Sequence, residues 1–240
     1  MCFHELVLDL SKDSFLKLSK VHFESFPKDR LCAILHSPRD DSFPIVRTTT
    51  PYTKPSQAFT GIYYDVMEKI RKNFTYDDSV DFNNAMCEIY TGDYRTMKFH
   101  SDQALDLSEN SWICLFSCYE DPFETNVRKL VVKKKGTLKE TVFKLEQNSC
   151  ILWNTKTNSE YVHKIVADSC DASRWLGVTF RLSKTYVGRK ADGSLYFKDS
   201  GKVLRTATNG ERQSFYKMKG LENAVSGYVY PHVSFTISQH

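Results

Sequence analysis

Two hydrophobic periodicities follow one another along this chain of 240 residues. Between residues 57 and 75, apolar side chains recur at three- and four-residue steps, which predicts one buried face of an amphipathic helix, with Ser56 as its N-cap. The positions on this face are Phe59, Ile62, Tyr63, Val66, Ile70 and Phe74. From about residue 84 onward, the pattern changes to short runs rich in β-branched and aromatic residues, separated by turn sequences such as ENS and KKGT. Many short strands after a helix predict a β-sandwich or jelly roll.

The runs divide the chain into three parts. The predicted strands read AMCEIY, RTMKFH, SWICLFSCY, RKLVVKK, TVFKL, SCILWN, YVHKIV and WLGVTFRL. We therefore predict an α+β, mainly β fold whose core is a double-stranded β-helix, or jelly roll, at residues 81–186. Residues 1–80 are expected to form a lid and helical support, and residues 187–240 a C-terminal extension packed on the core. We expect this extension to hold a hairpin and loops, with one more strand after Pro231.

Composition narrows the class of protein without naming a function. Hydrophobic residues make up 41% of the chain and no low-complexity tract occurs, as in a globular domain. The seven cysteines lack the paired spacing of a zinc site or a disulfide framework, which favours reduced thiols. The first residues do not resemble a signal peptide, and no stretch has the roughly 20 apolar residues that span a membrane. We expect an intracellular protein of the cytoplasm or nucleus, and its net charge of +4 permits contact with nucleic acid.

Three residues carry the clearest chemistry. His100 and Asp102, in KFHSDQ, and His163, in YVHKI, spell His-X-Asp followed by a distant histidine. Two imidazoles and one carboxylate are the donor set that holds non-haem Fe(II) and leaves coordination positions open. Positions two apart on a strand face the same side, so His100 and Asp102 can converge. The competing interpretation is that each histidine is an ordinary buried or surface residue, because His-X-Asp alone specifies little.

Arginines follow the second histidine at Arg174 and Arg181, in RWLGVTFR. A guanidinium group presents a fork that binds a carboxylate through two hydrogen bonds. A surface salt bridge is the alternative role for each. Because Val178 and Phe180 give the strand one apolar face, Arg181 is expected on the opposite face, where a buried anionic ligand would pair with it.

Together these motifs resemble the AlkB-like Fe(II)/2-oxoglutarate-dependent dioxygenases over about residues 84–186. The matching text is HSD at 100–102, NSEYVHKI at 158–165 and RWLGVTFR at 174–181. The resemblance implies that His100, Asp102 and His163 bind Fe(II), and that the enzyme uses 2-oxoglutarate and O2. It also implies that Arg174 pairs with the distal carboxylate of 2-oxoglutarate, and that Arg181, helped by Tyr90, pairs with the carboxylate near the metal.

The chain departs from the family pattern in two places. Glu88 stands where the family has an asparagine two residues before Tyr90, and it is a poor neighbour for a carboxylate unless protonated or turned away. Arg174 and Arg181 are seven residues apart, whereas the family's arginines are usually six apart and share a strand face. Either a bulge or turn near Trp175 restores the geometry, or only one arginine binds the co-substrate.

Three classes of function remain open at this point. By resemblance, the first is oxidative demethylation of alkylated bases in DNA or RNA, which would be single-stranded or base-flipped. The second is hydroxylation of a protein side chain or a small metabolite by the same metal centre, and the third is a non-enzymatic binding module. Basic residues of the region 128–139 and of the C-terminal part could follow a phosphate backbone, or could form an ordinary solvated surface.

Overall fold

The computed structural model describes residues 2–169 and 173–240. Its largest sheet is antiparallel through its centre and runs in the order β1-β10-β7-β12-β6-β3-β2, with the short β5 parallel to β3 at one side. The strands are β1 (His4–Val7), β2 (Glu24–Phe26), β3 (Arg30–His36), β5 (Gln57–Ala58), β6 (Asn84–Tyr90), β7 (Trp112–Tyr119), β10 (Ser149–Asn154) and β12 (Trp175–Arg181).

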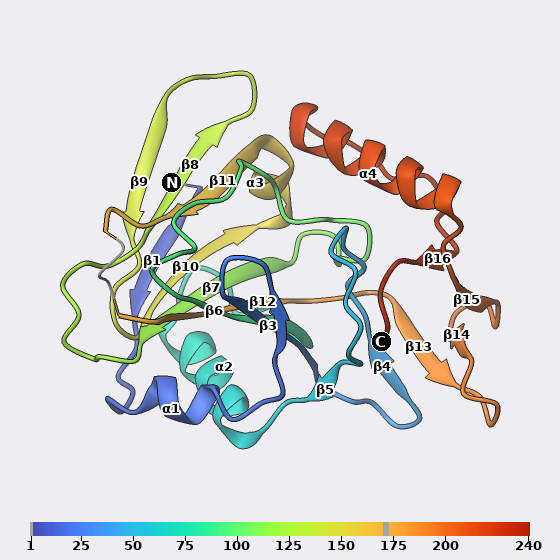
Figure 1. Cartoon of the computed structure of the whole chain (residues 1–240), viewed down its shortest axis with the longest axis horizontal. Coiled ribbons are helices and arrows are strands. Elements are labelled where there is room, and N and C mark those ends of the chain that lie inside the picture. The colour runs from blue at the N-terminus through green and yellow to red at the C-terminus, as the bar shows by residue number, and fades with distance from the viewer. Residues whose placement is uncertain (1, 170–172) are drawn as a thin grey trace.

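A smaller antiparallel sheet faces part of the main one (Figure 1). It contains β11 (Tyr161–Val166), β8 (Lys129–Lys134) and β9 (Glu140–Lys144). The predicted strand RTMKFH lies beside β11, where it forms isolated bridges from Thr96 to Val166 and from His100 to His163 rather than a regular strand. Side chains from both sheets, among them Leu115, Trp153, Leu130, Val132 and Ile165, pack into one buried cluster. The predicted jelly roll is confirmed.

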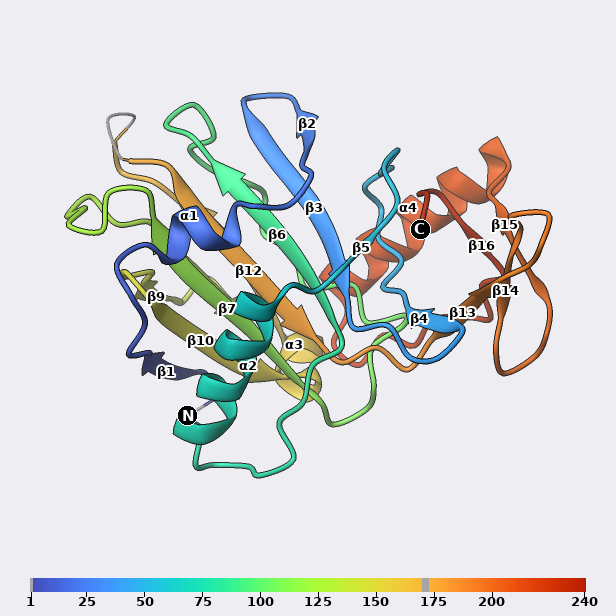
Figure 2. The same cartoon turned by 90° about the horizontal axis from the view of Figure 1, so that it is seen from below.

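Helices cover the opposite face of the main sheet (Figure 2). α2 (Gly61–Asn73) buries Tyr63, Val66 and Ile70 against the sheet, together with the short α1 (Ser14–Leu18). The apolar face was predicted, but the start of the helix was wrong: the N-cap is Thr60, not Ser56. The reason is that residues 57–58 are extended in β5, where they pair with the end of β3.

The first 80 residues do more than cover the core. β1 pairs with β10 at one end of the main sheet, and β3 pairs with β6 along its whole length at the other. Strands of this N-terminal part are therefore integral members of the main sheet.

The C-terminal part builds a separate layer. β4 (Ser42–Pro44), β13 (Tyr186–Arg189), β14 (Leu195–Phe197), β15 (Val203–Thr206) and β16 (Phe235–Thr236) form a third sheet, and β16 is the strand expected after Pro231. Three helices of the described residues were not predicted: the short α1, α3 (Thr155–Glu160), where a turn was expected, and α4 (Asn209–Ala224), where loops were expected. α4 has weak amphipathicity, but a capping box from Thr208 to Glu211 marks its start. Across the described residues, no helix is both long and apolar enough to cross a membrane. Cys170 lies outside the described residues.

Acid is expected to destabilise the folded chain through buried histidines. Burial lowers the pKa of His36 and of His240 to about 4 each. A histidine in the unfolded chain has a pKa near 6.5. Between about pH 6.5 and pH 4, these two histidines are therefore protonated in the unfolded chain but remain neutral in the folded one. Stability should fall by about 1.4 kcal/mol per pH unit per histidine across this interval. Urea unfolding of the metal-free protein between pH 7 and pH 4.5 measures this slope. His36→Gln should reduce the slope by the share of one histidine, because His240 and the other buried histidines remain. The exposed control His22→Asn should leave the slope unchanged, and an equal slope in all three proteins would contradict the expectation.

Candidate metal centre

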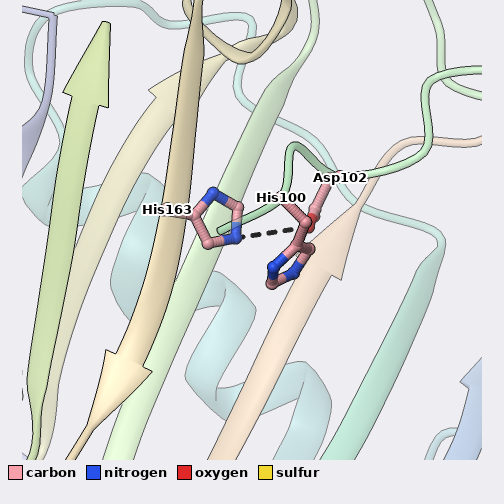
Figure 3. Close-up of side chains that lie close together, drawn as sticks. All are labelled: His100, Asp102 and His163. Carbon is pink, nitrogen blue, oxygen red and sulfur yellow. Dashed lines mark ion pairs between the residues drawn. The ribbon is translucent and has the colours of Figure 1, made fainter. Parts of the chain in front are cut away.

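The register of two chain segments brings the three predicted ligands together. His100 and His163 exchange backbone hydrogen bonds, from His100 N–H to the His163 carbonyl at 2.9 Å and from His163 N–H to the His100 carbonyl at 2.7 Å. This pairing holds β11 beside the segment that carries His100, so both imidazoles come to the same place between the sheets. Asp102 follows two residues later, where the segment has become a loop. Figure 3 shows the three side chains pointing toward one another.

The geometry suits a single metal ion. One candidate ligand atom from each of His100, Asp102 and His163 lies within 4.8 Å of the others. His163 Nε2 is 3.6 Å from Asp102 Oδ1, and the two imidazole centroids are 4.6 Å apart. His163 and Asp102 are buried and His100 is half-buried, so an ion here would be reached from one side. Two nitrogens and one oxygen on one side of an ion leave the opposite positions open.

Electrostatics keep the donors in the protonation states that a metal needs. Burial lowers the pKa of His163 to about 3 and also lowers that of His100, so both imidazoles are neutral at pH 7. Burial alone would raise the pKa of the Asp102 carboxyl, but Arg181, together with His163 and His100, outweighs burial and holds that pKa well below its usual range. Neutral imidazoles and an ionised carboxylate are the binding forms of these ligands.

Neighbouring side chains fix the orientation of Asp102. Arg181 Nε donates to Asp102 Oδ2 at 2.8 Å, which leaves Oδ1 on the side of His163. Asn158 holds the backbone: its Oδ1 accepts from Asp102 N–H, and its Nδ2 donates to the Asp102 carbonyl, both at 2.8 Å. Such partners beyond the ligands set their geometry and affect metal affinity.

α4 holds the same segment from the other side. Ser101 N–H donates to Asn223 Oδ1 at 3.0 Å, and Ala104 N–H donates to Glu222 Oε1 at 2.8 Å. Lys219 Nζ donates to the Ser101 carbonyl at 2.5 Å and to Glu222 Oε2 at 2.6 Å. The C-terminal extension thus packs directly on the segment that carries His100 and Asp102.

A cavity of about 230 Å³ opens beside His100 and Asp102. Its wall includes His100, Asp102, Arg181 and Tyr90, together with Thr48, Thr49, Thr50 and Tyr52 from the N-terminal part and Lys219 from α4. A recess of about 30 Å³ continues inward to His163, between Leu115, Trp153 and Ile165. A small ligand could therefore enter the space beside His100 and Asp102.

Arg174 does not reach this cavity. β12 pairs one-to-one with β6 from Trp175 to Arg181, so no bulge offsets the strand. Residues seven apart along a regular strand point to opposite faces, and Trp175 occupies the inward position at that end. Arg174 is about half exposed and forms an ion pair with Glu120. The expectation that Arg174 faces the co-substrate finds no support in this placement, whereas Arg181 and Tyr90 do line the cavity.

Three residues at the site escaped sequence reasoning. Arg30 on β3 and Lys219 on α4 line the cavity, and Asn158 holds Asp102. Asn158 belongs to the motif NSEYVHKI, but the sequence did not indicate that its side chain would bind the backbone of Asp102. Nothing in the local sequence marks Arg30 or Lys219, because each reaches the site only through the packing of a distant element.

The donor set and the cavity fit Fe(II) and a dicarboxylate such as 2-oxoglutarate. Two neutral imidazoles and an ionised carboxylate match a non-haem Fe(II) site. The described wall of the cavity carries three cationic side chains, Arg30, Arg181 and Lys219, against two carboxylates, Glu88 and Asp102. A dianion placed beside a divalent ion in this wall would meet net positive charge.

Comparison with known proteins supports the fold. OsALKBH1, an AlkB homologue, superposes with a TM-score of 0.50 at 14% sequence identity, over 75% of this chain and 97% of that one. The chain shares its fold with this AlkB homologue. A prolyl-4-hydroxylase from Pseudomonas putida gives a TM-score of 0.43 at 8% identity, over 75% of this chain and 92% of that one. No family model matches the sequence, and no curated protein does.

Proposed function

We propose that the chain is an Fe(II)- and 2-oxoglutarate-dependent dioxygenase. The observation that carries the proposal is the convergence of His100, Asp102 and His163 at an open cavity inside a jelly roll. Bound there, Fe(II) with 2-oxoglutarate and O2 would supply oxidation of a substrate C–H bond, with succinate and CO2 as the other products. The likeness in fold to an AlkB homologue agrees with this reaction class.

The chain's own residues perform the supporting tasks. His100, Asp102 and His163 would hold the metal, and Arg181 would keep the Asp102 carboxylate ionised and turned toward it. Leu115, Trp153 and Ile165 line the inner recess beside His163 and would give that ligand an apolar surround. The cavity on the other side would admit the co-substrate and the group to be oxidised.

For the substrate, the proposal names an alkylated base in single-stranded or base-flipped DNA or RNA. Support comes from the sequence resemblance and from positive charge beside the metal-binding segment. Lys133 and Lys164 each place Nζ over the ring of Phe99, at 4.3 Å and 4.4 Å from its centroid, and Phe99 immediately precedes His100. Lysines on the outside of the smaller sheet could contact phosphates, a contribution that weakens steeply with salt.

A panel of oligonucleotides tests the substrate class. The Fe(II)-loaded protein is incubated with 2-oxoglutarate and methylated or unmodified single strands of DNA and RNA, and formaldehyde and succinate are measured by mass spectrometry. We expect equal amounts of the two products with at least one methylated strand and background formaldehyde with its unmodified match. Succinate without formaldehyde from any strand, together with oxygen incorporated into peptides or a small metabolite, would replace the demethylase with the alternative hydroxylase.

A further inference from the structure

A carboxylate side chain of the protein itself, that of Glu88, is held by two hydrogen-bond donors at the wall of the cavity. The Glu88 side chain is buried and accepts hydrogen bonds from Arg30 Nε at 2.8 Å and from the Tyr90 hydroxyl at 2.9 Å. These two donors come from adjacent strands, because Arg30 on β3 lies directly opposite Tyr90 on β6. Glu88 thus acts as an internal stand-in that shows how Arg30 and Tyr90 together hold a carboxylate.

This pair of donors faces the same space as the metal ligands. Arg30, Glu88 and Tyr90 line the cavity of about 230 Å³ that also reaches His100 and Asp102. The Glu88 carboxylate engages Arg30 through Nε, so the terminal amino groups of the guanidinium lie outside this contact. A carboxylate entering from the cavity could therefore share Arg30 with Glu88 or displace Glu88 from it.

The other arginines near the site are engaged elsewhere. Arg174 lies outside the cavity with Glu120, and Arg181 is paired with Asp102. At the inward position of β12 beside Tyr90, the structure has Trp175, whose ring also covers Gly177. A ligand whose one end is at the metal would find no guanidinium on that end of β12, whereas Arg30 on β3 lines the cavity directly opposite Tyr90.

We propose that Arg30, with Tyr90, binds the distal carboxylate of 2-oxoglutarate, the role that the sequence resemblance assigns to Arg174. The inference rests on the proposed function, since it concerns the co-substrate of that reaction. Glu88 competes for the same donors and therefore weakens co-substrate binding.

Truncating the ligand isolates the contact. Binding to the anaerobic Fe(II)-loaded protein is measured by calorimetry for 2-oxoglutarate and for 2-oxobutyrate, which keeps the 2-oxo acid but lacks the distal carboxylate. Arg30→Met should weaken 2-oxoglutarate about 10- to 100-fold, the size of a lost charged hydrogen-bond pair, and should leave 2-oxobutyrate unchanged. Arg174→Met is the matched control and should bind both ligands like the unsubstituted protein.

Two further variants guard against effects on folding. Arg30→Met leaves Glu88 buried without its cation, so the double variant Arg30→Met/Glu88→Gln removes both charges and should show the same selective loss of 2-oxoglutarate. Glu88→Gln alone should bind 2-oxoglutarate more tightly than the unsubstituted protein, because the competing carboxylate is gone. Fe(II) titration of each variant should give the unsubstituted affinity.

The outcomes separate the inference from the proposed function. If the unsubstituted Fe(II)-loaded protein binds no 2-oxoglutarate, the proposed function fails. If it binds 2-oxoglutarate and both Arg30 variants bind it equally well, Arg30 is not the anchor, although the proposed function stands. The inference would also be overturned if Arg174→Met bound 2-oxoglutarate selectively more weakly while the Arg30 variants kept the affinity of the unsubstituted protein.

Discussion

Replacing Asp102 with asparagine is expected to weaken Fe(II) binding at least about 100-fold, because loss of partners beyond the ligands alone already costs roughly 10- to 100-fold. The substitution keeps the size of the side chain but removes the negative charge that Arg181 and the two histidines surround. Two neutral imidazoles would then be the only strong donors left at the site. Anaerobic Fe(II) titration followed by calorimetry measures the affinity.

His100→Ala and His163→Ala should lose metal to a comparable extent, since each removes one of the three converging donors. The exposed Asp81→Asn is the matched control: it removes a carboxylate paired with Arg71 at the surface and should bind Fe(II) normally. Full-strength binding in Asp102→Asn and in both histidine variants would show that the metal, if it binds, sits elsewhere.

The largest effect on stability is expected at Asp106, four residues after Asp102. Its fully buried carboxylate accepts from two donors of the Arg47 side chain, Nη2 at 2.7 Å and Nε at 3.0 and 3.2 Å, and also from Arg47 N–H at 2.7 Å. Arg47 in turn donates to the carbonyls of Val233 and Phe235. Through Arg47, the ion pair connects the N-terminal part with the segment after Asp102 and with residues 233–235 of the C-terminal part.

Asp106→Ala should lower the free energy of unfolding by about 3–5 kcal/mol, because it leaves a buried guanidinium without its counter-ion. Arg47→Met/Asp106→Leu should recover much of this loss, since it removes both charges and refills the volume. Urea unfolding measures all three proteins. Asp41→Ala, which breaks an exposed ion pair with Lys198, should lower the free energy of unfolding far less, because solvent screens that pair. A loss of that smaller size at Asp106 would contradict the role given to the buried pair.

The core strands and the metal ligands could be predicted because local patterns specify them. Alternation and turn chemistry locate β6 through β12 within a few residues, and the order of His100, Asp102 and His163 limits how the strands can bring them together. α4 was missed because its apolar face is narrow. Phe215 and Met218 enter an apolar cluster, whereas Lys219, Glu222 and Asn223 make polar contacts with the segment that carries His100 and Asp102.

The co-substrate contacts show the limit of sequence reasoning. An odd spacing within a strand already indicated that Arg174 and Arg181 face opposite ways, but only the continuous register of β12 excludes a bulge. The position of Arg30 depends on the pairing of β3 with β6, whose residues Arg30 and Glu88 are 58 apart in the chain. No local pattern encodes that pairing, so neither the Arg30–Glu88 ion pair nor its place in the cavity could be anticipated.

Succinate formation tests the central claim most directly. The purified protein is incubated with 2-oxoglutarate and O2, with and without Fe(II), and succinate is measured by mass spectrometry beside Asp102→Asn. We predict succinate that depends on Fe(II), appears at a low rate even without added substrate, and falls to background in the variant. No succinate above background with Fe(II) and the methylated oligonucleotide panel, or equal succinate from Asp102→Asn, would contradict the assignment of a dioxygenase centred on His100, Asp102 and His163.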